Sequence, residues 1–75
     1  MEGRHHRYNV IFAQRFEQLM KERQLYATDV ARMTGLSRQS IDGYVQGLNQ
    51  PTAYAITQIA VAFRVSSDWL LGIEK

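Results

Sequence analysis

The stretch from Leu25 to Gly47, LYATDVARMTGLSRQSIDGYVQG, predicts two short helices joined by a tight turn. The first helix should run from about Ala27 to Thr34, because the apolar residues of that segment recur with a helical period. Its inward face is expected to hold Val30, Ala31 and Thr34. Gly35 then supplies the left-handed residue that commonly ends a helix, and it marks the turn.

The second helix should begin at Ser37, whose hydroxyl can accept a hydrogen bond from the amide of Ser40 or its neighbour. It is expected over about Arg38 to Gln46, and Gly47 ends it. Its inward side chains should be Ile41, Tyr44 and Val45. Because only about three residues separate the two helices, they must cross steeply.

Several residues in and around this stretch have the spacing of a known family. They are Leu25, Ala31, the run Gly35-Leu36-Ser37, Ile41, Gly47, Pro51 and the closing VSSDWLLG over 65–72. On these residues the chain resembles the DNA-binding domain of the Cro and lambda-repressor (XRE) family of bacterial and phage regulators, from about Phe12 to Gly72. The resemblance implies an all-α fold, a compact five-helix lambda-repressor-like domain with a helix-turn-helix formed by the second and third helices.

Length and composition fit one small intracellular domain. The 75 residues include no cysteine, which excludes a disulfide framework and a thiolate metal site. No apolar run approaches the about 20 residues of a membrane span, and the first residues lack the apolar segment of a signal peptide. We therefore expect a soluble protein in the cytoplasm of a bacterium or a phage-infected cell, associated with the nucleoid.

The net charge of +2 is mild but unevenly distributed. Residues 1–38 hold seven of the nine Lys and Arg against four acids, whereas residues 39–75 hold two against three. The basic surface is therefore expected on the half that includes the helix-turn-helix.

Residues 1–9 show no helical period and are predicted to form a flexible basic arm, followed by the helix-turn-helix domain over residues 10–75. A disordered tail is favoured over an arm that enters a DNA groove. Asn9 is the expected N-cap of a helix from Val10 to about Arg23. The core face of that helix should consist of Phe12, Phe16, Leu19 and Met20, whereas Arg15, Glu22 and Arg23 should be solvated.

The helix expected over residues 38–46 is the candidate recognition helix. Its outward side should hold Arg38, Gln39, Ser40, Asp42, Gly43 and Gln46. By the resemblance, Arg38, Gln39 and Gly43 occupy the positions that most often read bases. Arg can bind guanine, and Gln adenine, with two hydrogen bonds each, and Asp42 can accept from cytosine or orient Arg38. Gly43 suggests either a close approach of the backbone to something or relaxed selection on base reading. The alternative is a helix that serves only for packing.

Contacts with the DNA backbone are predicted at a second set of positions: Ser37, Ser40, Gln46, Asn49, Ala27, Thr28, Arg4 and Arg7. The chain departs from the family pattern here. Tyr26 and Ala27 stand where the family has a capping residue followed by Gln, and the loop over residues 48–50 lacks the usual Lys or Arg. The N-terminal amides of the helix at Ala27 remain available to an anion, and Thr28 or Asp29 can partly satisfy them.

Another departure concerns Met20 and Val45, where many family members have Arg and Glu joined as a partly buried ion pair. Losing one partner of such a pair would cost about 3–5 kcal/mol, whereas replacing both by packed apolar residues is often neutral or stabilising. The paired change predicts that Met20 and Val45 pack together.

The last third of the chain should form two further helices. One is expected over about Ala53 to Phe63 with Thr52 as its cap, and a short one should begin after Ser66 or Ser67 and end at Gly72. A homodimer interface is predicted at Tyr54, Arg64, Val65 and Ser67.

The sequence therefore predicts a sequence-specific transcriptional regulator, most simply a repressor or a phage or plasmid switch protein. It should bind a palindromic operator in the major groove of double-stranded DNA as a homodimer. No enzyme, cofactor or metal site is predicted, since His5 and His6 are adjacent and point apart in an extended arm. The alternative is a protein-interaction module, such as an antitoxin or a repressor-binding partner. Its evidence is the lack of cations at Ala27, Gly43, Leu48 and Gln50.

Overall fold

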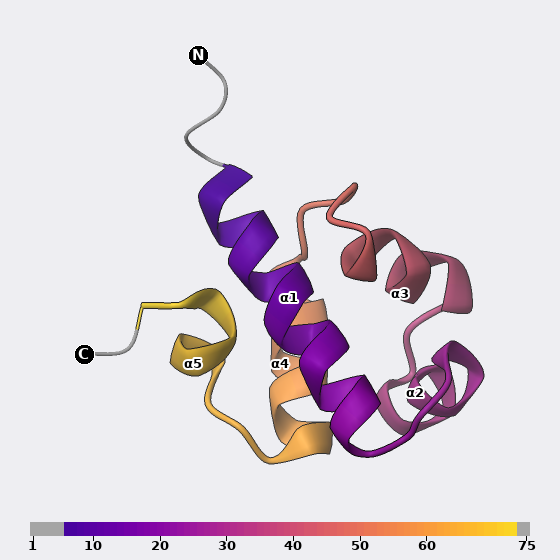
Figure 1. The fold of residues 1–75 in the computed structure, drawn as a ribbon. Coiled ribbons are helices and arrows are strands. Elements are labelled where there is room, and N and C mark those ends of the chain that lie inside the picture. Colours follow the sequence, from indigo (N-terminus) through magenta and orange to yellow (C-terminus); the bar gives the residue numbers. More distant parts are fainter. Residues whose placement is uncertain (1–5, 74–75) are drawn as a thin grey trace.

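A computed structural model describes residues 6–73, with side chains from Val10 onward. Over those residues it contains five helices and no strand (Figure 1). They are α1 (His6–Glu22), α2 (Ala27–Thr34), α3 (Arg38–Val45), α4 (Ala53–Phe63) and α5 (Ser67–Leu71). The predicted all-α, five-helix fold is confirmed. None of these helices is long and apolar enough to cross a membrane.

α1 begins at His6, one turn earlier than the sequence predicts. Asn9 therefore lies inside the helix, and its predicted role as N-cap is wrong. The added turn is polar, so the apolar period that located the rest of α1 carries no sign of it. Arg4 lies outside the described residues, whereas Arg7 belongs to the first turn of α1, of which only the backbone is described.

The core is built around α1, whose apolar face packs against α3, α4 and α5. Phe12 and Phe16 are fully buried, with ring centroids 5.7 Å apart. Each also meets an aromatic ring of another helix nearly edge to face. Phe12 meets Tyr44 of α3 at 5.7 Å and 80°, and Phe16 meets Phe63 of α4 at 6.2 Å and 78°. Aromatic pairs favour this geometry, so these contacts fix α3 and α4 relative to α1.

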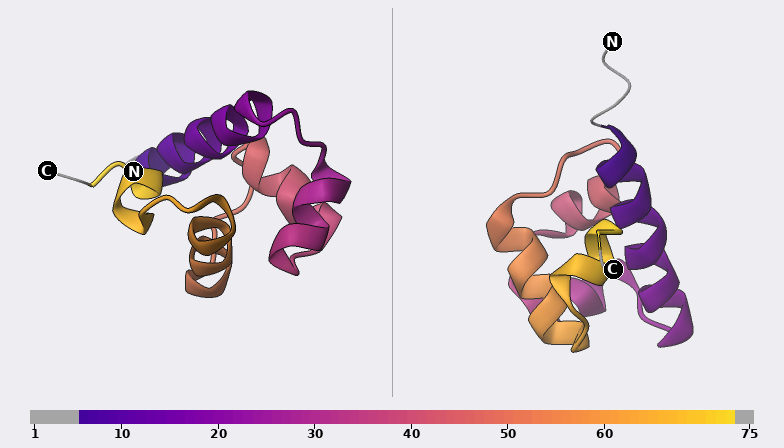
Figure 2. Two further views of the ribbon diagram at one scale, coloured as in Figure 1. Left: turned by 90° about the horizontal axis from the view of Figure 1, so that it is seen from below. Right: turned by 90° about the vertical axis from the view of Figure 1, so that its left-hand side faces the viewer.

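The turn between α2 and α3 forms as the sequence predicts. Gly35 has a φ of 78° and donates its backbone N–H to the carbonyl of Ala31 at 2.9 Å. Ser37 caps α3, its Oγ accepting from the amide of Ser40 at 3.0 Å. The two helices cross with only a short connection between them, and they form one end of the molecule in Figure 2.

Thr34 and Gln58 stabilise this turn through contacts that were not predicted from the sequence. The buried Thr34 donates its hydroxyl to the carbonyl of Val30 at 2.7 Å and accepts from the amide of Leu36 at 3.2 Å. Gln58, on α4, donates its side-chain amide to the carbonyl of Thr34 at 2.9 Å. The end of α2 is therefore fastened both to the turn and to α4.

Arg15 is half-buried, which corrects its predicted solvation, whereas Arg23 is exposed as predicted but also hydrogen-bonds to another helix. Arg15 donates a hydrogen bond to the carbonyl of Trp69, and its guanidinium carbon lies 4.9 Å from the centroid of the Trp69 ring. Arg23 donates to the carbonyl of Phe63 at 2.8 Å and lies 5.1 Å from that ring centroid. These contacts fasten α1 to α5 and to the end of α4.

Thr52 caps α4 as predicted, and of the two starts left open for α5 the one after Ser66 is observed. The Thr52 hydroxyl accepts from the amide of Ala55 at 3.0 Å to begin α4, and the Ser66 hydroxyl accepts from the amide of Trp69 at 2.9 Å to begin α5. Gly72 ends α5 with a φ of 74°. α5 packs beside α1, on the side away from α3 (Figures 1 and 2).

Candidate nucleic-acid interface

α3 presents a short polar surface to solvent. Arg38 and Gln39 occupy its first turn and are exposed, and Asp42 and Gln46 continue the same side of the molecule, also exposed. On the opposite side Ile41 is fully buried and Tyr44 nearly so, while Val45 is half-buried. The exposed side chains are of the types that hydrogen-bond to base edges in a major groove.

Gly43 is buried, which corrects its predicted place among the outward residues of α3. The side chain of Asn49, from the loop that follows α3, lies directly over it. A Cβ at position 43 would lie 2.1 Å from Nδ2 of Asn49 and 3.0 Å from its Cγ. Of the two explanations the sequence left open, a close approach to the backbone is therefore the one observed, and the approaching group belongs to the protein itself.

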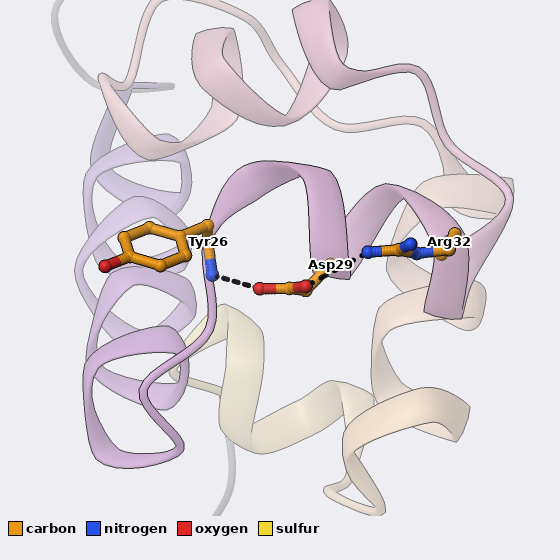
Figure 3. Close-up of polar contacts among 3 residues, drawn as sticks. All are labelled: Tyr26, Asp29 and Arg32. Atoms are coloured by element: carbon orange, nitrogen blue, oxygen red, sulfur yellow. Dashed lines mark hydrogen bonds and ion pairs between the residues drawn. The ribbon is translucent and has the colours of Figure 1, made fainter.

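The start of α2 is capped by Asp29 and not by the residue at the N-cap position. Asp29 accepts a hydrogen bond from the backbone N–H of Tyr26 at 2.8 Å, and its other carboxylate oxygen lies 3.2 Å from Nη2 of Arg32 (Figure 3). The Tyr26 side chain is 78% exposed and makes no cap hydrogen bond to the helix. Of the two predicted backbone contacts here, Thr28 is exposed and Ala27 is half-buried. The carboxylate lowers the positive potential that this helix end would offer to a phosphate.

The remaining predicted backbone contacts are unevenly placed. Ser37 and Ser40 hydrogen-bond to each other through their hydroxyls at 2.9 Å, so both already take part in capping α3. Gln46 and Asn49 are exposed, and so is Leu48 beside them, at 72%. The loop between α3 and α4 thus offers amide groups and an apolar side chain, but no cation.

Met20 and Val45 are both half-buried and pack against the hydrophobic core, from α1 and α3 respectively. α1 and α3 pack against each other, so the two positions lie in a shared interface. Direct contact between Met20 and Val45 stays a prediction.

The predicted dimer residues do not form one uniform surface. Tyr54 is 61% exposed, and Arg64 and Ser67 are also exposed. Val65, by contrast, is half-buried and packs against the core, so it contributes mainly to the fold of its own chain. Val61, which was not among the predicted dimer residues, is 72% exposed. Its exposure could have been predicted, because it is an apolar side chain on α4 that lies outside the core positions 55, 59 and 63.

The described residues include no group of three or more His, Cys, Asp or Glu that could hold a metal ion. Among known families, one described as helix-turn-helix matches residues 16–70. This range begins within α1 and includes α2 to α4 and most of α5. No curated protein and no solved structure matches the chain.

Proposed function

The chain belongs to the helix-turn-helix family of Cro- and lambda-repressor-like domains, and from this premise we propose that it represses transcription by occupying a palindromic operator as a homodimer. Membership supports the coarser statement directly: this is a DNA-binding domain of the transcription-regulator type. Repression, the palindrome, the dimer and a role as a phage or plasmid switch are the proposed parts. The site of action would be the DNA of a bacterial cytoplasm.

The exposed pair Arg38 and Gln39 is the observation that supports sequence-specific binding. Both lie in the first turn of α3, which Ser37 caps, and the N-terminal residues of a recognition helix are those that reach base edges. Arg38 suits the O6 and N7 acceptors of guanine, and Gln39 suits the N6 and N7 groups of adenine. Together they would read two neighbouring base pairs.

We infer a dimer because a single α3 has only Arg38 and Gln39 to read bases, which specifies too few base pairs for an operator. Two copies on a palindrome would place their recognition helices about 34 Å apart, one turn of the duplex. The exposed side chains of Tyr54, Val61, Arg64 and Ser67 would supply the contact. These exposed side chains are few and mixed in character, which favours a weak dimer that DNA stabilises. A protein of this kind represses by excluding RNA polymerase from the DNA that it occupies.

DNA binding can be tested by titrating the protein against random duplex DNA at low and moderate salt. Log K should fall by about 0.9 for each phosphate neutralised per tenfold rise in salt, so a dimer using one cation per copy gives a slope near −2. Selection from a pool of random duplexes should then return a palindromic consensus. Flat salt dependence together with no consensus would refute the proposal.

Two exposed side chains favour a second candidate function. Tyr26 is 78% exposed at the start of α2, and Leu48 is 72% exposed in the loop after α3. The resemblance implies phosphate contacts next to Tyr26, at the position of Ala27, and in the loop that contains Leu48. An apolar or aromatic group there suits a protein partner better than DNA, as in an antitoxin or a repressor-binding module. The salt titration separates the candidates, because a module of this kind would bind duplex DNA weakly at any salt concentration.

A further inference from the structure

We propose that Asn49 is a specificity-determining residue, which reads a base pair from the place on α3 where Gly43 lacks a side chain. The inference rests on the proposed function and extends it from the helix to the loop that follows. Recognition would then use a composite surface, with Arg38 and Gln39 from the start of α3 and the Asn49 carboxamide from the loop.

The position of the carboxamide is set by Gly43. Residues 39, 43 and 46 follow the i, i+4, i+7 spacing of one helix face, and both Gln39 and Gln46 are exposed on it. At the centre of this row, Nδ2 of Asn49 lies 2.1 Å from where a Cβ of residue 43 would be. The carboxamide of Asn49 therefore occupies the position on this helix face where a side chain of residue 43 would lie. Asn49 itself remains exposed.

The polar groups of this carboxamide are available to a ligand. Among residues 10–73, whose side chains are described, no hydrogen bond joins the side chain of Asn49 to another group. Its contact with Gly43 is a packing contact, which is possible because glycine has no side chain and leaves room against the helix backbone. Asn, like Gln, can form two hydrogen bonds with N6 and N7 of adenine in a major groove. A phosphate contact would use only its donor.

Gly43 and Asn49 should therefore act as one unit. Replacing the glycine by alanine puts a methyl group where the carboxamide lies. The clashing atom is the far end of a flexible side chain, which can rotate away, so Gly43→Ala should fold and displace Asn49 from the row. Alanine is also the better helix former. The variant would thus lose a base contact while keeping or improving its stability.

The test compares base preferences of four proteins, selected from random duplex DNA: the unaltered chain, Asn49→Ala, Gly43→Ala and the double variant. Asn49→Ala should lose about 5- to 150-fold of discrimination at one base pair in each half-site, the range expected for one bidentate contact. Gly43→Ala should lose preference at the same base pair, and the double variant should lose no more than either single change. Gln50→Ala, an exposed change at the next loop residue, is the matched control and should keep the full consensus.

A measurement without DNA tests the geometry separately. In a nitrogen-15 spectrum, the side-chain amide pair of Asn49 is identified by its loss in Asn49→Ala, and it should move in Gly43→Ala while most backbone signals stay. An unmoved pair would overturn the inference. So would an unchanged consensus in Asn49→Ala, or an equal loss of affinity on all sequences, which indicates a phosphate contact. In those cases the unaltered chain still selects a consensus; if it selects none, the proposed function fails and the inference with it.

Discussion

The hydrogen bond from Gln58 to the carbonyl of Thr34 should be a main support of the helix-turn-helix, and Gln58→Ala tests this. The bond is 2.9 Å long and partly buried, and it joins residues 24 positions apart. Its loss leaves a carbonyl at the end of α2 without this donor. A hydrogen bond of this kind contributes about 1 kcal/mol net, and an acceptor left unsatisfied raises the cost to about 1–3 kcal/mol.

For a domain of this size, each kcal/mol corresponds to about 4–8 °C of melting temperature. Gln58→Ala should therefore melt at least about 4 °C lower in circular dichroism at 222 nm. The matched control is Gln18→Ala, which makes the same chemical change on α1. The Gln18 side chain donates to Glu22 at 3.0 Å in an exposed i, i+4 pair, so its loss should cost less than about 0.5 kcal/mol. Equal melting temperatures for the two variants would refute the reasoning.

Three further outcomes are expected. Val45→Glu should bury an uncompensated charge and cost several kcal/mol in urea unfolding, and adding Met20→Arg should restore much of that loss; additive costs would show that the two side chains do not meet. Arg38→Ala should lower affinity for the selected operator by about 1–3 kcal/mol and relax preference at one base pair per half-site, whereas equal weakening on random DNA in a gel-shift titration would remove Arg38 from base reading. Gly72→Ala should destabilise by about 2 kcal/mol or more in thermal melts, because its φ of 74° is unfavourable for alanine and its Cβ would lie 2.8 Å from Cγ2 of Ile11 in α1. A melting temperature unchanged in Gly72→Ala would contradict that close approach.

Features fixed by neighbouring residues could be predicted from the sequence. α2 and α4 have the predicted bounds, and the serine and threonine caps at Ser37 and Thr52 form as expected. These signals are local. A cap contacts amides only three residues away, and a glycine that ends a helix is favoured by its own positive φ. The start of α1 was not predicted, because its first turn has Tyr8 alone among polar residues and so shows no apolar period.

Features set by distant parts of the chain could not be predicted. An arginine on the polar side of a helical pattern looks solvated, but Arg15 and Arg23 find carbonyls 54 and 40 positions away. Helical period alone puts Gly43 on the outside, yet a loop side chain buries it. Arg38 and Gln39 are exposed on α3 as the sequence predicts, whereas the position of the loop side chain over Gly43 depends on tertiary packing. That this surface reads bases stays a prediction.

The attachment of α5 leads us to expect that this helix opens more readily than the rest of the fold. α5 has only five residues, too few to persist as an isolated helix, and it is held to α1 by the Arg15 contact with Trp69 across 54 positions of sequence. Closing so long a loop costs entropy that the contact repays only once α1 is formed. We therefore expect α5 to dock last during folding and to open first in the native state, so that its amides exchange with solvent by local unfolding while those of α2, α3 and α4 stay protected. Loss of its last helix would then leave the DNA-reading end of the domain intact.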